Sequence, residues 1–207
     1  SFILRKDHVA ALEYGERAVI LLFYIALTQR LIAHYLATHA LADLLALPSE
    51  SMVIALMLLR RPAQAFSARA EDWALALGAS LLPLMLVPGG ASAGPAWIGW
   101  CLQTFGFFAQ LICKLSLFRS FGIAPATRGL VMRGPYALVR HPMYASYFFS
   151  QAGFLYAFPT WWNALILALW TLGQFWRMAA AERVLGRDAN YRTYMQRVRW
   201  RLLPGVH

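Results

Sequence analysis

Apolar runs long enough to cross a bilayer alternate with short polar segments along the chain. A helix needs about 20 apolar residues to span the hydrocarbon layer, and this length divides the chain into six candidate helices. The predicted spans are residues 17–38, 41–59, 73–87, 96–117, 144–158 and 161–177. The second span contains Pro48, Ser49 and Glu50, and the fifth is short. The pattern therefore predicts an all-α fold, a polytopic bundle of about five to six transmembrane helices.

Composition supports a membrane environment over a soluble one. Hydrophobic residues make up 60% of the 207 residues and charged residues only 14%, whereas soluble domains carry about 25% charged residues. The net charge of +10 is also typical of proteins that bind nucleic acids. The basic residues alternate with bilayer-length apolar runs, however, so orientation in a membrane explains them better. We expect membrane lipids as neighbours and no nucleic-acid partner.

Positive charge also predicts the orientation of the chain. If the N-terminus is cytoplasmic, the outer loops are residues 39–41, 88–95 and 158–161, and none of them contains Lys or Arg. The basic residues outside the helices then lie inside, as the positive-inside rule requires. They are Arg5, Lys6, Arg17, Arg60, Arg61, Arg69, Arg119, Arg128, Arg133, Arg140 and those from Arg177 onward. We predict a multi-pass protein with both termini cytoplasmic, a topology that suits a bacterial inner membrane.

Two basic residues lie within predicted spans, where charge is costly and often functional. Lys114 is near the inner end of its helix and is expected to extend its amine toward the interface. Arg30 lies deeper. We expect it to pair with Asp43 or Glu50 inside the bundle, and a contribution to a substrate cavity is the alternative.

Polar residues gather in two inside segments, 128–144 and 177–194. In the first, Gly134-Pro135 predicts a turn. Pro142 suits the first turn of a helix, which places His141 at a helix entrance beside unpaired backbone N–H groups. In the second, the sixth helix emerges into water. Since the fifth and sixth spans form a hairpin, both segments are expected at the same membrane depth.

The ordered motifs of these segments resemble the isoprenylcysteine carboxyl methyltransferase family and the related phospholipid methyltransferases. They are Gly-Pro-Tyr-x3-Arg-His-Pro-x-Tyr (134–144), Arg-x4-Glu-x2-Leu (177–185), Tyr-x2-Tyr (191–194) and a basic tail with Leu-Leu-Pro (202–204). The resemblance covers roughly residues 118–204. It divides the chain into an N-terminal transmembrane scaffold, residues 1–117, and a cytoplasm-facing C-terminal methyltransferase region, residues 118–207.

The resemblance implies S-adenosylmethionine as cofactor, no metal, and a lipophilic acceptor that enters from the bilayer. Arg177 matches the family's substrate-contacting arginine. The family has two adjacent glutamates after it, whereas this chain has Ala181-Glu182. In the family the first of these glutamates helps to bind the cofactor. Either Glu182 takes over this role at the catalytic site, beside Arg177, or the cofactor's amino group is held otherwise. The implied cofactor-binding residues are Arg128, Gly129, Leu130, Val131, Tyr136, His141, Pro142, Met143 and Tyr144.

The possible methyl acceptors differ in whether they need a general base. A carboxylate is already ionised, and Arg177 can hold it with two hydrogen bonds. An amine has to lose a proton, for which His141 and Glu182 are the candidates. We therefore predict a methyltransferase acting on a carboxylate, or another heteroatom, of a lipophilic small molecule. The alternatives are a phospholipid or amine N-methyltransferase, an NADPH-dependent membrane reductase of the sterol-reductase type, and a non-enzymatic membrane protein.

Overall fold

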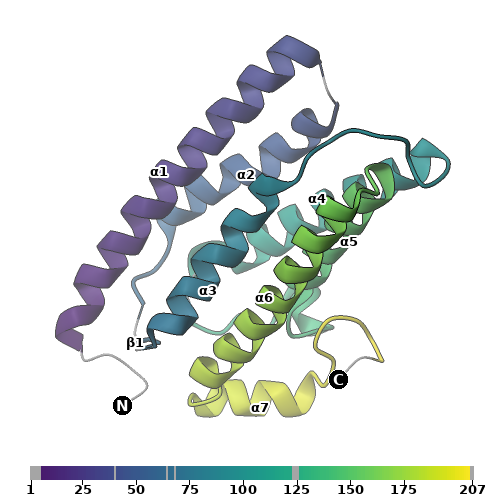
Figure 1. Cartoon of the computed structure of the whole chain (residues 1–207). Helices are drawn as coiled ribbons and strands as arrows, with labels where there is room; N and C mark the ends of the chain where they lie inside the picture. Colours follow the sequence, from purple (N-terminus) through teal and green to yellow (C-terminus); the bar gives the residue numbers. More distant parts are fainter. Residues whose placement is uncertain (1–5, 40, 64, 68, 123–125, 206–207) are drawn as a thin grey trace.

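All six predicted spans appear as helices in the computed structural model of the chain, which describes residues 6–39, 41–63, 65–67, 69–122 and 126–205 (Figure 1). The helices are α1 (Lys6–Thr38), α2 (Leu41–Leu59), α3 (Ala70–Leu81), α4 (Ala96–Leu117), α5 (Pro142–Ala157), α6 (Trp161–Leu185) and α7 (Ala189–Arg197). The strands β1 (Ala65–Phe66) and β2 (Ala126–Thr127) form one short antiparallel pair. The predicted all-α fold is confirmed.

Two prolines within the predicted spans have different effects on the helices. At Pro83 the α-helical geometry of α3 changes to the 3-10 helix η1 (Leu82–Met85), because proline lacks the N–H that an α-helix needs. Pro48 lies inside α2, yet the helix runs from Leu41 to Leu59 without a break. The helix therefore continues through Pro48, Ser49 and Glu50.

Close packing of α4 against α5 joins the middle of the chain to the candidate site. The other main contacts are those of α1 with α2, α2 with α4, and α3 with α6 (Figure 1). Gly153 on α5 allows the two backbones to approach each other. A Cβ atom at this position would lie 2.7 Å from both the Gln103 nitrogen and the Gly99 oxygen of α4, a separation that only glycine permits.

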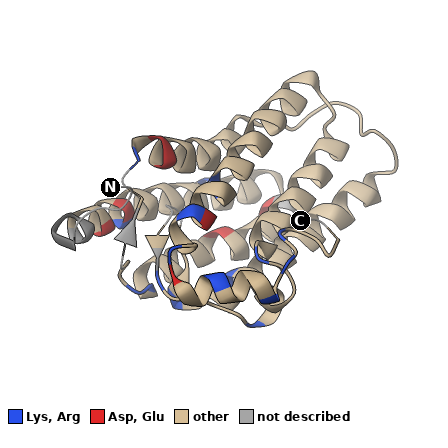
Figure 2. Ribbon diagram, turned by 90° about the horizontal axis from the view of Figure 1, so that it is seen from below, with Lys and Arg blue, Asp and Glu red and all other residues tan. Residues whose placement is uncertain are grey.

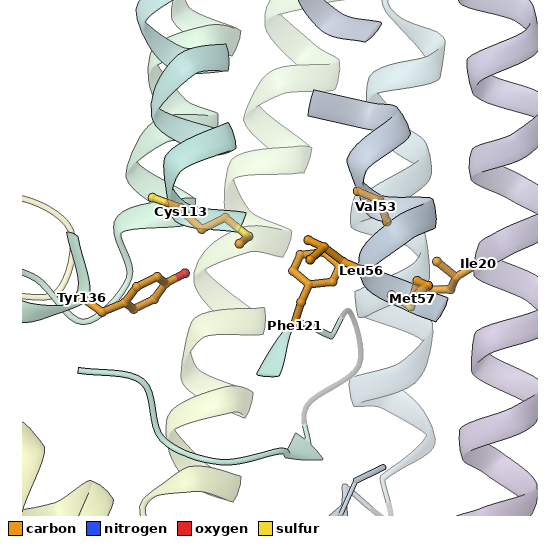
Figure 3. Packing of buried hydrophobic residues seen from close by; sticks show 8 residues of the cluster. Ile20, Val53, Leu56, Met57, Cys113, Phe121 and Tyr136 are labelled. Carbon is orange, nitrogen blue, oxygen red and sulfur yellow. The ribbon is translucent and has the colours of Figure 1, made fainter. Parts of the chain in front are cut away.

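A buried apolar cluster fixes the loops after α4 against α1 and α2. Ile20, Val53, Leu56 and Met57 meet Cys113, Phe121, Tyr136 and Met143 in this cluster. Figure 3 shows Phe121 beside Leu56 and the Tyr136 ring directed toward the helix that carries Cys113. Burial of large apolar side chains stabilises such a contact by roughly 1.5–3 kcal/mol each. The scaffold helices therefore hold the loop that contains Tyr136.

Three helices among the described residues are long and apolar enough to cross a membrane: Ala11–Thr38, Ala96–Ser120 and Trp161–Leu185. They expose large apolar side chains, such as Leu22, Phe105 and Leu172, as expected for lipid-facing surfaces. The structure therefore supports an integral-membrane protein, and the number of spans stays a prediction.

Charged residues gather at one end of the bundle, around α7 and the loops beside it (Figure 2). The described part of α1 begins at this end and α7 lies across it (Figure 1). This separation of charge is what an oriented membrane protein requires. The cytoplasmic side of the charged end and the bacterial inner membrane remain predictions, and Arg5 lies outside the described residues.

The two basic residues within spans behave differently from the sequence-based expectation. Lys114 does not extend to the interface: it is 1% exposed, and its Nζ donates to the backbone oxygen of Ser49 at 2.7 Å and to the Ser49 hydroxyl at 2.8 Å. Arg30 is exposed and lines a cavity. Its expected partners pair elsewhere, since Asp43 bonds His34 and Glu50 lies 3.7 Å from Lys114.

Candidate active site

The loop between β2 and α5 supplies one wall of the candidate site. Gly129 adopts a φ of +101°, a conformation that favours glycine. Gly134 and Pro135 begin the 3-10 helix Gly134–Ala137, so the predicted turn is confirmed. Among the predicted cofactor residues of this loop, Arg128, Gly129, Leu130, Val131 and Tyr136 all line one cavity.

His141 lies at the entrance of α5, as predicted. It is the N-cap residue, and Pro142 occupies the first turn of the helix. The backbone N–H groups of Arg140 and His141 donate to the oxygens of Trp200 and Arg201 at 2.9 and 2.8 Å. These two donors are therefore used by the C-terminal tail. His141, Met143 and Tyr144 line the same cavity, whereas Pro142 is buried and is absent from its lining.

Arg177 reaches this cavity from α6. Its side chain is 9% exposed, and one terminal nitrogen donates to the Gln174 Oε1 at 3.2 Å. The guanidinium carbon lies 5.8 Å from the centre of the Tyr144 ring, within the range of a cation–π contact. The predicted meeting of the two polar segments is therefore confirmed, with Arg177 and Tyr144 on one cavity.

Glu182 contacts His141 and two arginines. Its Oε1 lies 3.0 Å from the His141 Nε2 and 3.3 Å from the Arg140 Nε, and its Oε2 lies 3.2 Å from Arg201. Ala181 lines the cavity and Glu182 is absent from the lining. The geometry gives Glu182 contact with His141, so it can orient that ring. Its predicted role at the reaction site itself stays a prediction.

Arg128 is held by two carboxylates of α1. One terminal nitrogen lies 3.1 Å from Glu13 Oε2 and 2.9 Å from Glu16 Oε2, and Arg60 contacts the same glutamates at 2.7 and 2.8 Å. We call these four residues the α1 charge cluster. Burial lowers the pKa of Arg128, but a guanidinium keeps its proton in proteins. Among these four buried residues two positive charges meet two negative ones, which suits their buried position. The partly exposed Arg17 adds a further contact to Glu13 Oε1 at 3.3 Å.

α7 and the residues after it close the site. The Tyr194 hydroxyl donates to the Tyr136 oxygen at 2.7 Å, so α7 is tied to the cofactor loop. Burial raises the pKa of Tyr194 to about 12 and that of Tyr136 well above its usual range, and both hydroxyls stay protonated at neutral pH. Tyr191 and Tyr194 thus pack against the site, and both line the cavity.

The cavity that these residues share has a volume of about 580 Å³, within the range of roughly 300–1,000 Å³ that is usual for small-molecule sites. Sequence reasoning missed its lining residues from the N-terminal half, among them Tyr24 of α1 and Glu50 of α2. The sequence did hold one signal for this contribution, because Glu50 is an acidic residue within an otherwise apolar span. The predicted scaffold region therefore contributes to the site, and the predicted division at residues 117/118 stays untested.

The cavity suits S-adenosylmethionine, a molecule with an aromatic base, a sulfonium and an amino-acid part. Tyr136 and Tyr144 line the cavity, and tyrosine rings can contact a base or a cation. Backbone around Gly129 is accessible, and Arg140 and Arg177 bring positive charge to the wall. The buried Tyr191 hydroxyl has no hydrogen-bond partner among the described residues, so it can form a hydrogen bond with a polar group of a ligand.

Comparison with known proteins agrees with the motifs. The family model described as phospholipid methyltransferase matches residues 96–187, a little under half of the chain, from the start of α4 to just beyond α6. The match confirms the resemblance inferred from the sequence and supports a membrane methyltransferase in general. No curated protein matches the chain.

Proposed function

We propose that the chain transfers a methyl group from S-adenosylmethionine to a carboxylate of a lipophilic small molecule. The single observation that carries the proposal is the shared cavity, where His141, Tyr144 and the loop around Gly129 face the same space as Arg177. These residues come from segments about 40 positions apart, and they match the ordered motifs. The family match adds support for methyl transfer, and the acceptor is inferred from the charges of the wall.

When bound, S-adenosylmethionine supplies a methyl group whose bond to sulfur breaks as its bond to the acceptor oxygen forms, so opposite charges on donor and acceptor disappear and no proton moves. Arg177 holds the acceptor carboxylate with its guanidinium. Gln174 and the Tyr144 ring restrict the orientation of that guanidinium. Holding two reactants in line in this way contributes several kcal/mol to catalysis.

His141 and its partners shape the donor end of the cavity. Glu182 fixes the imidazole through Nε2, and the tail fixes the backbone N–H of His141. Tyr136 and Tyr194, joined by their hydrogen bond, exclude water from this end. A dry cavity strengthens the electrostatic contacts of Arg177 and His141.

The test uses the purified full-length chain in detergent with a methyl-labelled donor and lipophilic acids. We expect His141→Ala and Arg177→Ala each to abolish turnover while the protein elutes as a folded species. Arg192→Ala is the matched control, because Arg192 is exposed on α7 and should keep full activity. Full activity in both site variants would refute the proposed site.

A second candidate, methylation of an amine such as that of a phospholipid, is favoured by Glu50. This carboxylate lines the same cavity as Arg177, and its Oε1 lies 3.7 Å from the Lys114 Nζ. An acceptor amine has to lose its proton before it attacks. Glu50 is thus a base candidate that sequence reasoning missed, and the family description also names phospholipids.

Glu50→Gln separates the two candidates. With a carboxylate acceptor, turnover per folded molecule stays unchanged or rises, since repulsion of the acceptor disappears. The melting temperature is measured beside turnover, because Glu50 lies 3.7 Å from the buried Lys114. With an amine acceptor, turnover falls by roughly 10²-fold or more, the usual contribution of a general base. Glu71→Gln, at an exposed position on α3, is the control. Thermal stabilisation by NADPH and not by S-adenosylhomocysteine would instead favour a sterol-reductase type of activity, and stabilisation by neither a non-enzymatic protein.

A further inference from the structure

The two tyrosines of α7 are equally buried but differ in their hydrogen bonds. Tyr191 is 4% exposed and Tyr194 is 3% exposed, and their rings lie 5.6 Å apart. The Tyr194 hydroxyl donates to the backbone oxygen of Tyr136. Within the described residues, the Tyr191 hydroxyl has no hydrogen-bond partner. The structure therefore leaves one of two neighbouring hydroxyls unsatisfied.

An unsatisfied buried hydroxyl is unfavourable. It has lost its hydrogen bonds to water without gaining one in the protein, and most buried polar side-chain atoms avoid this state. Phenylalanine would fill nearly the same volume on α7 without the penalty. Because Tyr191 also lines the cavity, a bound ligand is a natural partner for its hydroxyl.

The charges around Tyr191 indicate the kind of ligand group. Glu182 has the largest electrostatic effect on Tyr191, followed by Arg140 and Arg201, and the Glu182 carboxylate contacts both arginines. Two guanidinium groups therefore share one carboxylate, and His141 contacts that carboxylate as well. Burial raises the pKa of Tyr191, so the hydroxyl stays protonated and acts as a donor. A protonated donor near excess positive charge favours an anionic oxygen.

We propose that the Tyr191 hydroxyl donates a hydrogen bond to the carboxylate in the amino-acid part of the methyl donor, in the positive field of Arg140. Arg140 lines the cavity, so both residues face the space that the donor is proposed to occupy. The inference rests on the proposed function and adds a binding residue beyond the family match, which ends at residue 187. Tyr191 is a recognition residue here and takes no part in bond making.

The experiment compares Tyr191→Phe with Tyr194→Phe in the full-length protein. Two probes are titrated: S-adenosylhomocysteine, which has the amino-acid part, and 5′-methylthioadenosine, which lacks it. For Tyr191→Phe we expect about tenfold weaker binding of S-adenosylhomocysteine, the usual effect of one hydrogen bond to a charged group. Binding of methylthioadenosine should match that of the unmodified protein.

Thermal unfolding without ligand supplies the second readout. Tyr191→Phe should keep the melting temperature or raise it slightly, because it removes an unsatisfied group. Tyr194→Phe should lower the melting temperature, because it leaves the Tyr136 oxygen without its donor. A merely structural role for Tyr191 would give the two variants the same loss of stability and would overturn the inference.

The binding outcomes are equally distinct. Equal affinity of the unmodified protein and Tyr191→Phe for S-adenosylhomocysteine overturns the inference alone. Equal weakening of both probes also overturns it, since the hydroxyl would then act on something other than the amino-acid part. Failure of the unmodified protein to bind S-adenosylhomocysteine would overturn the proposed function and this inference together.

Discussion

Neutralising Glu16 of the α1 charge cluster should unfold the protein at a markedly lower temperature. Glu16 is 2% exposed in its side chain and contacts Arg60 and Arg128, whose side chains are 0% and 2% exposed. Glu16→Gln leaves two buried guanidinium groups with one carboxylate, that of Glu13. Because the cluster joins α1 to the end of α2 and to the cofactor loop, the change acts on all three.

The magnitude follows from the cost of an uncompensated buried charge. Breaking a buried ion pair by removing one partner costs about 3–5 kcal/mol. For a chain of this size that loss lowers the melting temperature by roughly 6–20 °C. The matched control is Glu71→Gln, because Glu71 pairs with Arg69 at 2.9 Å but is 52% exposed in its side chain. An exposed pair contributes only about 0–1 kcal/mol.

The assay is thermal unfolding in one detergent, followed by the loss of the monodisperse peak on size exclusion. The double variant Glu16→Gln with Arg60→Gln should recover part of the loss, since the remaining charges of Glu13 and Arg128 balance again. Equal melting temperatures for Glu16→Gln and Glu71→Gln would refute the buried cluster. A double variant no more stable than Glu16→Gln would refute the charge-balance argument.

Three further predictions concern the site and the packing that supports it. Glu182→Gln should reduce turnover about tenfold or more, measured with labelled donor, because a weaker contact at His141 Nε2 loosens the ring; unchanged turnover would mean that Glu182 does not orient it. Gly153→Ala should lower the stability by about 1–3 kcal/mol, measured as thermal unfolding against Gly78→Ala, since a Cβ at Gly78 meets no atom within 4 Å. At high pH the protein should lose stability, because burial raises the pKa of Tyr194 to about 12 and favours its protonated form in the folded state. The contribution of Tyr194 is complete below pH 10, and at most roughly 2–3 kcal/mol is lost as the pH rises toward 12. Burial raises the pKa values of Tyr136 and Tyr191 as well, so Tyr194→Phe should make this part of the pH profile shallower without removing its slope.

Local patterns predicted the helices well, because their signals lie in neighbouring residues. Apolar runs marked the helices α1 to α6, and the dipeptide His141-Pro142 predicted the start of α5 within the motif. The short polar helix α7 (Ala189–Arg197) has no such run and was not predicted. In the structure α1 begins eleven residues before the predicted span, and these residues are Lys6 to Glu16. They are too polar to be recognised by the length of an apolar run. Burial of Glu13 and Glu16 is compensated by Arg60 and Arg128, which lie far away in the sequence.

The residues of the candidate site were predictable where sequence motifs contain them. They were not predictable where packing between distant parts of the chain brings them to the site. Arg177 and His141 were predicted to meet, because a hairpin connects their helices. The contribution of Glu50 depends on where α2 packs in the bundle, and no short-range pattern encodes that position. The same holds for Lys114, whose partner Ser49 is 65 positions away. Its burial could not be predicted from its place near a helix end.

We propose that a methyl donor binds at the charged end of the bundle, between the loop before α5 and the C-terminal half of α6. Calorimetric titration of the full-length protein with S-adenosylhomocysteine measures this binding. We expect saturable binding at one site per chain, lost in His141→Ala and kept in Arg192→Ala. Absence of heat with the unmodified protein, or undiminished binding in His141→Ala, would contradict it.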